Sequence, residues 1–391
     1  MSTVAPLLDG AVVVSAAASL ALVPRVLRAG PRPGRGGRSR GGRLGPEAAL
    51  AAAVALVHLN QVLVAVYVNR VHGGDASFVA RYLPPGWFDV PRLDSLAARF
   101  PAPELLAPSV LRVQAFLELP LVLLAFVSVV RRLDRALYVR LARSPLVPLA
   151  AVSYTVAFCA IEWALRNPYT VDDLVLRVLS AVAAPPLISC LAAREPTTPS
   201  APRRNPFLFA LDLWAYGQLM LVLYDTALLY NLARLGDHLL AAAAALAVLV
   251  TTRLVDRLAD RHVDRSADRP ADRSTAPPPG PYVTTLTATI GRALALFLVP
   301  ALSIRYAQTF ASPRLAALAS LVVIGAAARR DVLRLLLPAL AGAAVGYAVA
   351  VLAPGPYYEA TLLRSATGAL LATTALCALL DTSRARLVVR S

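Results

Sequence analysis

The sequence contains no lysine, and all 39 of its basic residues are arginine. Because lysine codons are AT-rich and Ala, Gly and Pro are abundant, we attribute this absence to a GC-rich bacterial genome and not to function. Cysteine and histidine are also scarce, with three and four copies. They show none of the spacings of zinc or haem motifs, and each cysteine stands alone in an apolar run. The sequence therefore predicts neither a disulfide framework nor a metal centre built from these residues.

Acidic residues are few, which leaves a net charge of +16, yet 58% of the residues are hydrophobic and the mean hydropathy is +0.61. This composition is too apolar for an ordinary soluble domain. A basic soluble protein would suggest nucleic acid, but here the arginines lie in short strips between apolar runs of about 20 residues, the length that crosses a bilayer. The sequence predicts an integral membrane protein and excludes a nucleic-acid partner.

The apolar runs predict an all-α polytopic protein that forms a single membrane domain over residues 1–391. Basic residues follow the first run instead of preceding it, which favours a retained span over a cleaved signal peptide. We expect about eleven transmembrane helices, at residues 4–26, 48–69, 108–130, 146–165, 174–193, 207–232, 237–253, 283–304, 313–328, 335–353 and 365–382.

Arginine alternates between the segments that connect these spans. Segments 27–47, 131–145, 194–206, 254–282, 329–334 and 383–391 hold 25 of the 39 arginines but nine of the 23 acidic residues. Arginine near span ends is held on the cytoplasmic side. We therefore place the N-terminus outside and the C-terminus in the cytoplasm of a bacterial plasma membrane.

Three connecting segments have a distinct character. Residues 27–47 form a flexible basic linker suited to anionic lipid head groups. Residues 70–107 form a structured extracytoplasmic loop that carries Trp87 among other aromatic residues. Residues 254–282 contain an Asp-Arg pair repeated every four residues, which extends the preceding helix until Pro270, and then a proline-rich stretch. We predict a solvated, partly disordered cytoplasmic hairpin there.

Several predicted spans carry polar side chains in hydrocarbon, where an ionised group costs at least ~2.5–3.5 kcal/mol. The simplest arrangement pairs Arg292 with Glu118 or Asp225, and His58 and Gln218 complete a hydrogen-bonded cluster. Two interpretations stay open: a network that only holds the helices together, or the floor of a ligand or catalytic cavity.

Further acids gather at the predicted outer ends. Capping of the span at 174–193 explains Asp172 and Asp173, but explains Glu162 less well. From the deep and outer groups together we predict catalytic roles for Asp75, Glu118, Glu162 and Asp225, and substrate-binding roles for His58, Gln61, Gln218, Arg166, Arg292, Arg305 and Trp87. A divalent cation on the acids is the one cofactor these residues suggest.

These features favour a transferase that acts at the outer leaflet on a lipid or lipid-linked substrate. The number of spans and the early outward loop with an acid resemble polyprenyl-phosphate-dependent membrane glycosyltransferases. Asp75 stands between Gly74 and Ala76 without the paired acid of that family, and an outer N-terminus also departs from it, so no family is assigned.

Two alternatives remain. The first is a proton-coupled transporter that uses the intramembrane His, Glu, Asp and Arg cluster, with Pro185-Pro186 dividing one span into two half-helices. The second is a non-catalytic scaffold subunit whose polar groups only set helix packing.

Overall fold

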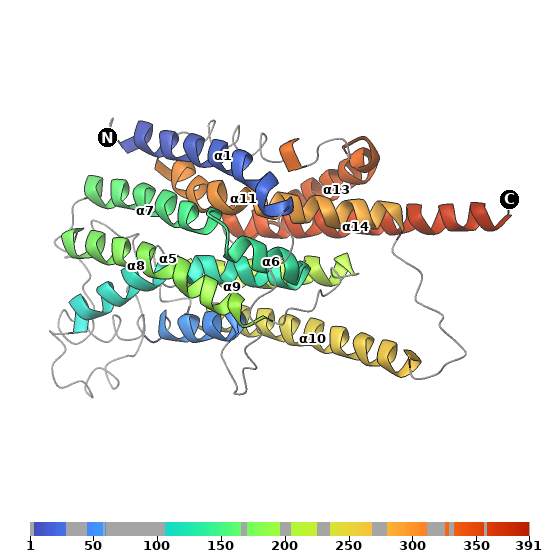
Figure 1. Ribbon diagram of the computed structural model, residues 1–391, viewed down its shortest axis with the longest axis horizontal. Helices are drawn as coiled ribbons and strands as arrows, with labels where there is room; N and C mark the ends of the chain where they lie inside the picture. The colour runs from blue at the N-terminus through green and yellow to red at the C-terminus, as the bar shows by residue number, and fades with distance from the viewer. Residues whose placement is uncertain are drawn as a thin grey trace. The chain divides into compact units, whose positions relative to one another are not determined.

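The computed structural model describes residues 4–28, 45–57, 59, 106–165, 170–195, 205–224, 235–267, 280–310, 325–327, 332–355 and 358–390. Within these residues all regular secondary structure is helical, as predicted (Figure 1). The helices are α1 (Val4–Arg28), α5 (Leu106–Leu133), α6 (Arg135–Ala142), α7 (Leu146–Leu165), α8 (Thr170–Ala193), α9 (Pro206–Tyr224), α10 (Leu235–Ala267), α11 (Pro281–Phe310), α13 (Val332–Leu352) and α14 (Tyr358–Arg390).

Four stretches of helix are long and apolar enough to cross a membrane: Asp173–Ala193, Pro281–Pro300, Leu333–Leu352 and Ala360–Arg384. A fifth span results if α6 and the first part of α7, which meet at an angle of 63°, are taken together. All five overlap predicted spans. The full set of eleven spans and the orientation of the termini stay predictions.

Helix α8 shows why the chain suits a membrane. Its outward side carries Val171, Val175, Val178, Leu179 and Val182, whose exposed fractions range from 51% to 69%. Its inward side buries Asp173, Arg177 and Ser180. A helix with apolar residues outside and charged residues inside reverses the pattern of soluble proteins. Lipid is the solvent that makes this arrangement stable.

Prolines inside the helices do not end them. Helix α8 continues through Pro185 and Pro186, and Asp173–Ala193 counts as one unbroken span. The expectation of two half-helices at this proline pair is therefore wrong. Proline in a membrane helix is tolerated where neighbouring helices and local adjustments satisfy the released carbonyl groups.

The described chain packs as two compact units. The first comprises Met1–Ser200, Val222–His238 and Arg292–Ala327, and the second comprises Ala201–Leu221, Leu239–Gly291 and Ala328–Ser391. Each unit consists of three separate segments that alternate with those of the other along the chain, so the division follows packing and not sequence order.

In the first unit, α5 packs along α8, while α7 contacts both α1 and α8. Glu118 of α5 meets Arg177 of α8, and 13 residues further along α5 Arg131 meets Glu195, just after α8. Because the contacts advance in the same direction along both helices, α5 and α8 run parallel. This agrees with the predicted topology, in which both helices begin on the outer side.

The second unit is built around the α13–α14 hairpin, which makes the most extensive helix contact among those described. Asp381 of α14 also caps α11, because its two carboxylate oxygens accept hydrogen bonds from the backbone N–H groups of Tyr282 and Val283, each at 3.0 Å. Gly280 permits this approach, since a Cβ there would overlap the Asp381 carboxyl group. The start of α11 and the end of α14 thus meet, as the predicted topology requires.

Two helices extend into segments that the sequence assigns to connections. Helix α6 lies within segment 131–145 and begins at the N-cap Asp134, whose side chain accepts hydrogen bonds from the backbone of Ala136 and Leu137 at 2.8 and 3.1 Å. Helix α10 continues past the predicted span end at residue 253 as far as Ala267, through the first Asp-Arg repeats. Most of the basic linker and the extracytoplasmic loop lie outside the described residues.

Candidate functional site

A buried ion pair in the first unit joins α5 to α8. The Glu118 Oε2 atom accepts from the Arg177 Nη1 atom at 2.6 Å. Both residues are buried, with exposed fractions of 5% and 6%. A charge-assisted hydrogen bond between two buried groups offsets part of the desolvation free energy that each charge loses in an apolar interior.

Helix α7 completes this contact with two aromatic side chains. The Tyr154 hydroxyl donates a hydrogen bond to Glu118 Oε1, so each carboxylate oxygen has a partner. Phe158 follows one helical turn later, and the Arg177 Cζ atom lies 3.3 Å from the centre of its ring. A guanidinium group over an aromatic face is attracted by the ring quadrupole. Glu118, Arg177, Tyr154 and Phe158 form what we call the deep cluster.

Asp173 extends the polar side of α8 beyond the deep cluster. It is buried and precedes Arg177 by four residues, so the two lie on the same face of the helix. Asp173 belongs to the first turn of α8, and Arg177 follows in the second. A buried acidic and basic row therefore leads from the start of α8, the predicted outer end, to Glu118.

In the other direction the interior is mainly apolar. Leu121, Leu124 and Val127 of α5 are buried, as are Ala184 and Ile188 of α8. Buried hydroxyl groups interrupt this region at Ser128 and Ser180. Thirteen residues separate Glu118 from Arg131, which corresponds to about 20 Å along the helix axis.

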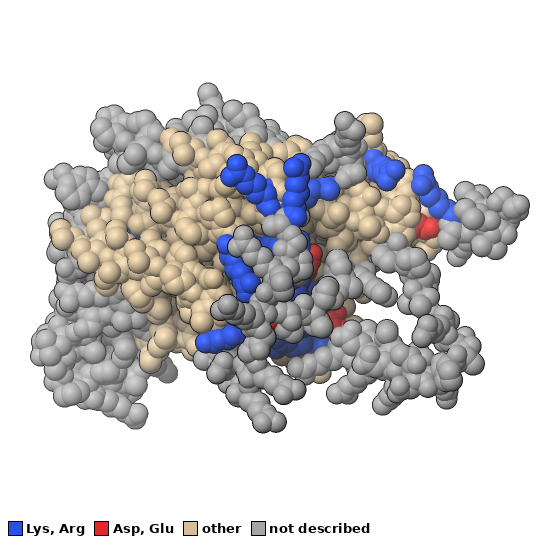
Figure 2. Space-filling view, viewed as in Figure 1, with Lys and Arg blue, Asp and Glu red and all other residues tan. Residues whose placement is uncertain are grey.

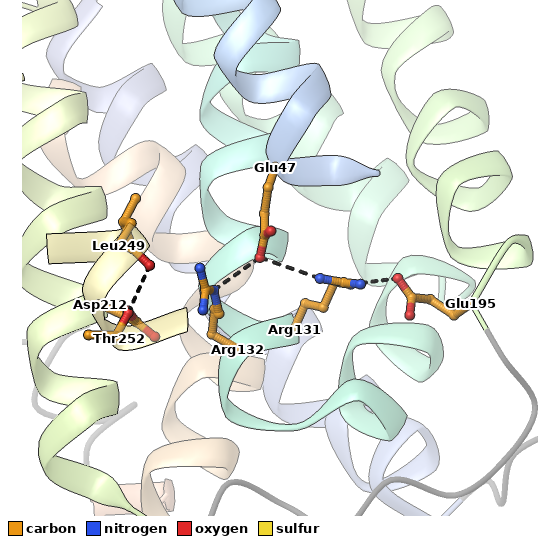
Figure 3. A network of polar contacts seen from close by, with 7 residues as sticks. All are labelled: Glu47, Arg131, Arg132, Glu195, Asp212, Leu249 and Thr252. Carbon is orange, nitrogen blue, oxygen red and sulfur yellow. Dashed lines mark hydrogen bonds and ion pairs between the residues drawn. The ribbon is translucent and has the colours of Figure 1, made fainter. Parts of the chain in front are cut away.

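At the far end of this apolar region, arginines of α5 meet two glutamates (Figure 3). Arg131 Nε lies 2.5 Å from Glu195 Oε1, and Arg131 Nη1 lies 3.4 Å from Glu47 Oε1. Arg132 Nε lies 3.0 Å from the same Glu47 oxygen. Burial lowers the pKa of Arg131, but the hydrogen bond and charge of Glu195, together with the charge of Glu47, raise it above its usual value. We call these four residues the end network.

The end network connects three segments that the arginine pattern assigns to one face of the membrane. Glu47 ends the basic linker, Arg131 and Arg132 begin segment 131–145, and Glu195 lies in segment 194–206. Their contact agrees with a common side for these segments.

The structure describes the side chains of only a few of the predicted site residues. Glu118 lies in the deep cluster, while Gln218 is half-buried on α9. Glu162 lies in α7 and Arg305 in α11, but only their backbone is described. The other predicted site residues apart from Arg292 lie outside the described residues: His58, Gln61, Asp75, Trp87, Arg166 and Asp225.

The sequence predicts that Arg292 pairs with Glu118 or Asp225, but its described hydrogen bond is to a backbone carbonyl group. Its Nε atom donates to the Ala327 carbonyl oxygen at 2.9 Å. Ala327 stands at the end of the predicted span 313–328, so the guanidinium group reaches towards a helix end. A long arginine side chain commonly reaches in this way towards a membrane surface. The arginine that the structure pairs with Glu118 is Arg177.

Sequence reasoning missed Arg177 and Tyr154 as members of the site. A signal for Arg177 was present, because it is a lone arginine inside the apolar span 174–193 and follows Asp173 by one turn. Tyr154 carried no such signal, since a tyrosine within an apolar run usually packs like any other aromatic residue.

Among the described side chains, no group of three or more His, Cys, Asp or Glu residues could hold a metal ion. Comparison with models of protein families, with curated proteins and with solved structures gives no match.

Proposed function

We propose that the chain is a multi-pass enzyme of the bacterial plasma membrane, a transferase that acts at the outer leaflet on a lipid or lipid-linked substrate. The observation that supports this proposal is the deep cluster together with Asp173. It supplies an acid and an arginine, both buried, on a polar row that leads from one end of α8. In the topology with eleven spans and an outer N-terminus, that end faces outward.

In the proposed reaction Arg177 exchanges its partner, the Glu118 carboxylate, for a phosphate of the substrate. A phosphate of a lipid carrier forms strong, often bidentate, hydrogen bonds with a guanidinium group. When it binds Arg177, the Glu118 carboxylate is released to act as general base, and Tyr154 holds its Oε1 atom in place. Glu118 takes the proton of an acceptor hydroxyl, whose oxygen forms the new bond. The carrier phosphate then leaves with the electron pair of the bond that breaks.

A second candidate function is proton-coupled transport, because Glu118 lies near the middle of α5, between Leu106 and Leu133. Two observations favour the enzyme. Helix α8 is unbroken at Pro185 and Pro186. The interior between the deep cluster and the end network is mainly apolar, so polar groups approach Glu118 chiefly from one end.

Deletion of the gene in its host, followed by mass spectrometry of the lipid extract, tests the proposal. We expect one carrier-linked lipid to accumulate in the deletion strain, and the wild-type gene to remove it. Glu118→Gln should leave the lipid accumulated, because an amide cannot accept the proton. Glu195→Gln is the matched control, since Glu195, a half-buried glutamate just after α8, is also paired with an arginine of α5. It should remove the lipid as the wild type does.

The outcomes separate the candidate functions. If Glu118→Gln protein, present at wild-type amount, restores the lipid profile, the transferase proposal is wrong. An unchanged lipid profile in the deletion strain, combined with lost uptake of a solute, supports the transporter instead. If the Glu118→Gln protein is not present in the membrane, the double variant Glu118→Leu with Arg177→Leu replaces it in the test. This double variant leaves no unpaired charge.

A further inference from the structure

Helix α6 has two opposite faces. Leu137, Tyr138, Leu141 and Ala142 are buried against the first unit. Each residue turns the helix by 100°, so Arg140 lies away from the buried residues, while Arg135 stands at the edge of the buried face in the first turn and Arg143 at the C-cap. Arg135 and Arg143 are exposed, and Arg140 is half-buried. An apolar face packed on the protein and a basic side turned away from it are the pattern of an amphipathic helix at the surface of the molecule.

These arginines differ from their neighbours in the end network. Arg131 and Arg132 are paired with glutamates. Arg135, Arg140 and Arg143 make no ion pair with a carboxylate in the part of the chain that the structure describes. The Nε atom of Arg140 is buried and has no hydrogen-bond partner there.

The last turn of α1 adds two more basic residues. Arg25 and Arg28 are exposed there, and α1 contacts α6. They too have no ion pair with a described acidic residue. We call Arg25, Arg28, Arg135, Arg140 and Arg143 the arginine band. In Figure 2 the charged side chains on the face shown are mainly basic, and broad areas of the described surface carry no charge.

We propose that the arginine band binds the head groups of anionic phospholipids in the leaflet on that side of the membrane. The occupant is identified by charge and position. The band holds five positive charges that no described acidic residue pairs, and it lies at the end of α5 and α1 where the apolar helices stop. Lipid phosphates are the anions present at that level, and arginine binds phosphate in a bidentate manner.

This proposal does not rest on the transferase activity, only on the location of the chain in a membrane. It gives α6 a role that its sequence alone does not reveal. The helix bends by 63° from α7 instead of continuing it. The exposed arginines at and beside this bend are available to lipid phosphates.

The test uses the full-length protein, reconstituted in an equimolar mixture of phosphatidylglycerol and phosphatidylcholine. Native mass spectrometry then counts the lipids that stay bound after release into mild detergent. We expect the wild type to retain phosphatidylglycerol in excess. The triple variant Arg135→Gln, Arg140→Gln and Arg143→Gln should lose at least about fivefold of this preference, the typical contribution of a single basic residue near an anionic surface.

The matched control replaces the same three residues by lysine, which keeps the charge. It should retain most of the preference, and high salt should weaken the preference in both proteins because the groups are exposed. The proposal is overturned if the glutamine variant retains phosphatidylglycerol as the wild type does, or if the lysine variant loses it to the same extent. If the glutamine variant does not fold, Arg25→Gln with Arg143→Gln is used, since both side chains are exposed.

Discussion

Helices α5 and α8 of the first unit and helices α13 and α14 of the second pack closely by opposite means. Between α5 and α8 lie two arginine–glutamate pairs, Arg177–Glu118 and Arg131–Glu195. Between α13 and α14 the closest contacts involve glycine, alanine, serine and threonine. Among the described residues of that hairpin interface, no ion pair joins the two helices.

The α13–α14 contact depends on missing side chains. A Cβ at Gly342 would lie 2.6 Å from the Ala369 carbonyl oxygen and would overlap the Thr373 side chain. At Gly346 the Ser365 hydroxyl donates to the glycine carbonyl at 2.8 Å. Small residues four apart bring helix backbones close enough for dispersion and hydrogen bonds to hold them in lipid.

The hairpin shows that this chain can hold membrane helices together without buried charge. Replacing a buried ion pair by apolar residues is often neutral or stabilising, so the pairs between α5 and α8 are not required for packing as such. Glu118 and Arg177 are the more deeply buried of the two pairs. A buried ion pair that packing does not require is consistent with a role beyond packing.

The largest effect should come from breaking the deep pair on one side only. Glu118→Leu leaves the Arg177 cation buried without its carboxylate, which should lower the free energy of unfolding by about 3–5 kcal/mol. Adding Arg177→Leu should recover most of this loss. Unfolding in detergent of graded denaturing strength measures both variants.

The double variant decides between structure and function. If it is as unstable as Glu118→Leu, the pair is needed for packing and the contrast with α13–α14 fails. If it is stable but leaves the lipid accumulated in the deletion strain, the pair has a functional role.

A smaller loss should follow from adding one methyl group between α13 and α14. Gly342→Ala places a Cβ against the Ala369 backbone, which cannot move aside as a flexible side chain can. We expect destabilisation of about 1–3 kcal/mol. Gly10→Ala in α1 is the matched control, because nothing lies within 4 Å of a Cβ there. Equal stability of the two variants would show that the hairpin tolerates separation.

The helical fold could be predicted from the sequence because its apolar runs have the length of a membrane span. An apolar run of that length is typical of a membrane helix and of few other structures. The arginine pattern grouped Glu47, Arg131 and Glu195 on one face, and the structure joins these residues. Helix α6 was missed because eight residues with two arginines, placed between other arginines, resemble a connecting segment. Its capping residue Asp134 and its Leu137 and Leu141 spacing indicate a helix only when the buried surface is known.

The partner of Glu118 could not be derived from the sequence. Pairing depends on which helices are neighbours, and span order does not determine this in a bundle with many helices. The expectation favoured Arg292, although Arg177 lies on the helix that packs along α5. Glu118 could be assigned to the site from the sequence, because an acidic side chain in hydrocarbon is energetically costly. Its contacts could be identified only once the packing of the helices was known.

The smallest effect should come from the end network. Glu195→Gln removes one carboxylate charge, but Arg131 keeps Glu47 at 3.4 Å, and its side chain is 19% exposed. The cation is therefore neither isolated nor fully cut off from water, so we expect a loss of at most about 1 kcal/mol, less at high salt. The same unfolding assay at two salt concentrations measures it. A loss of stability as large as that of Glu118→Leu would mean that the two ion pairs contribute equally to stability despite their different burial. Only the lipid profile would then support a special role for Glu118.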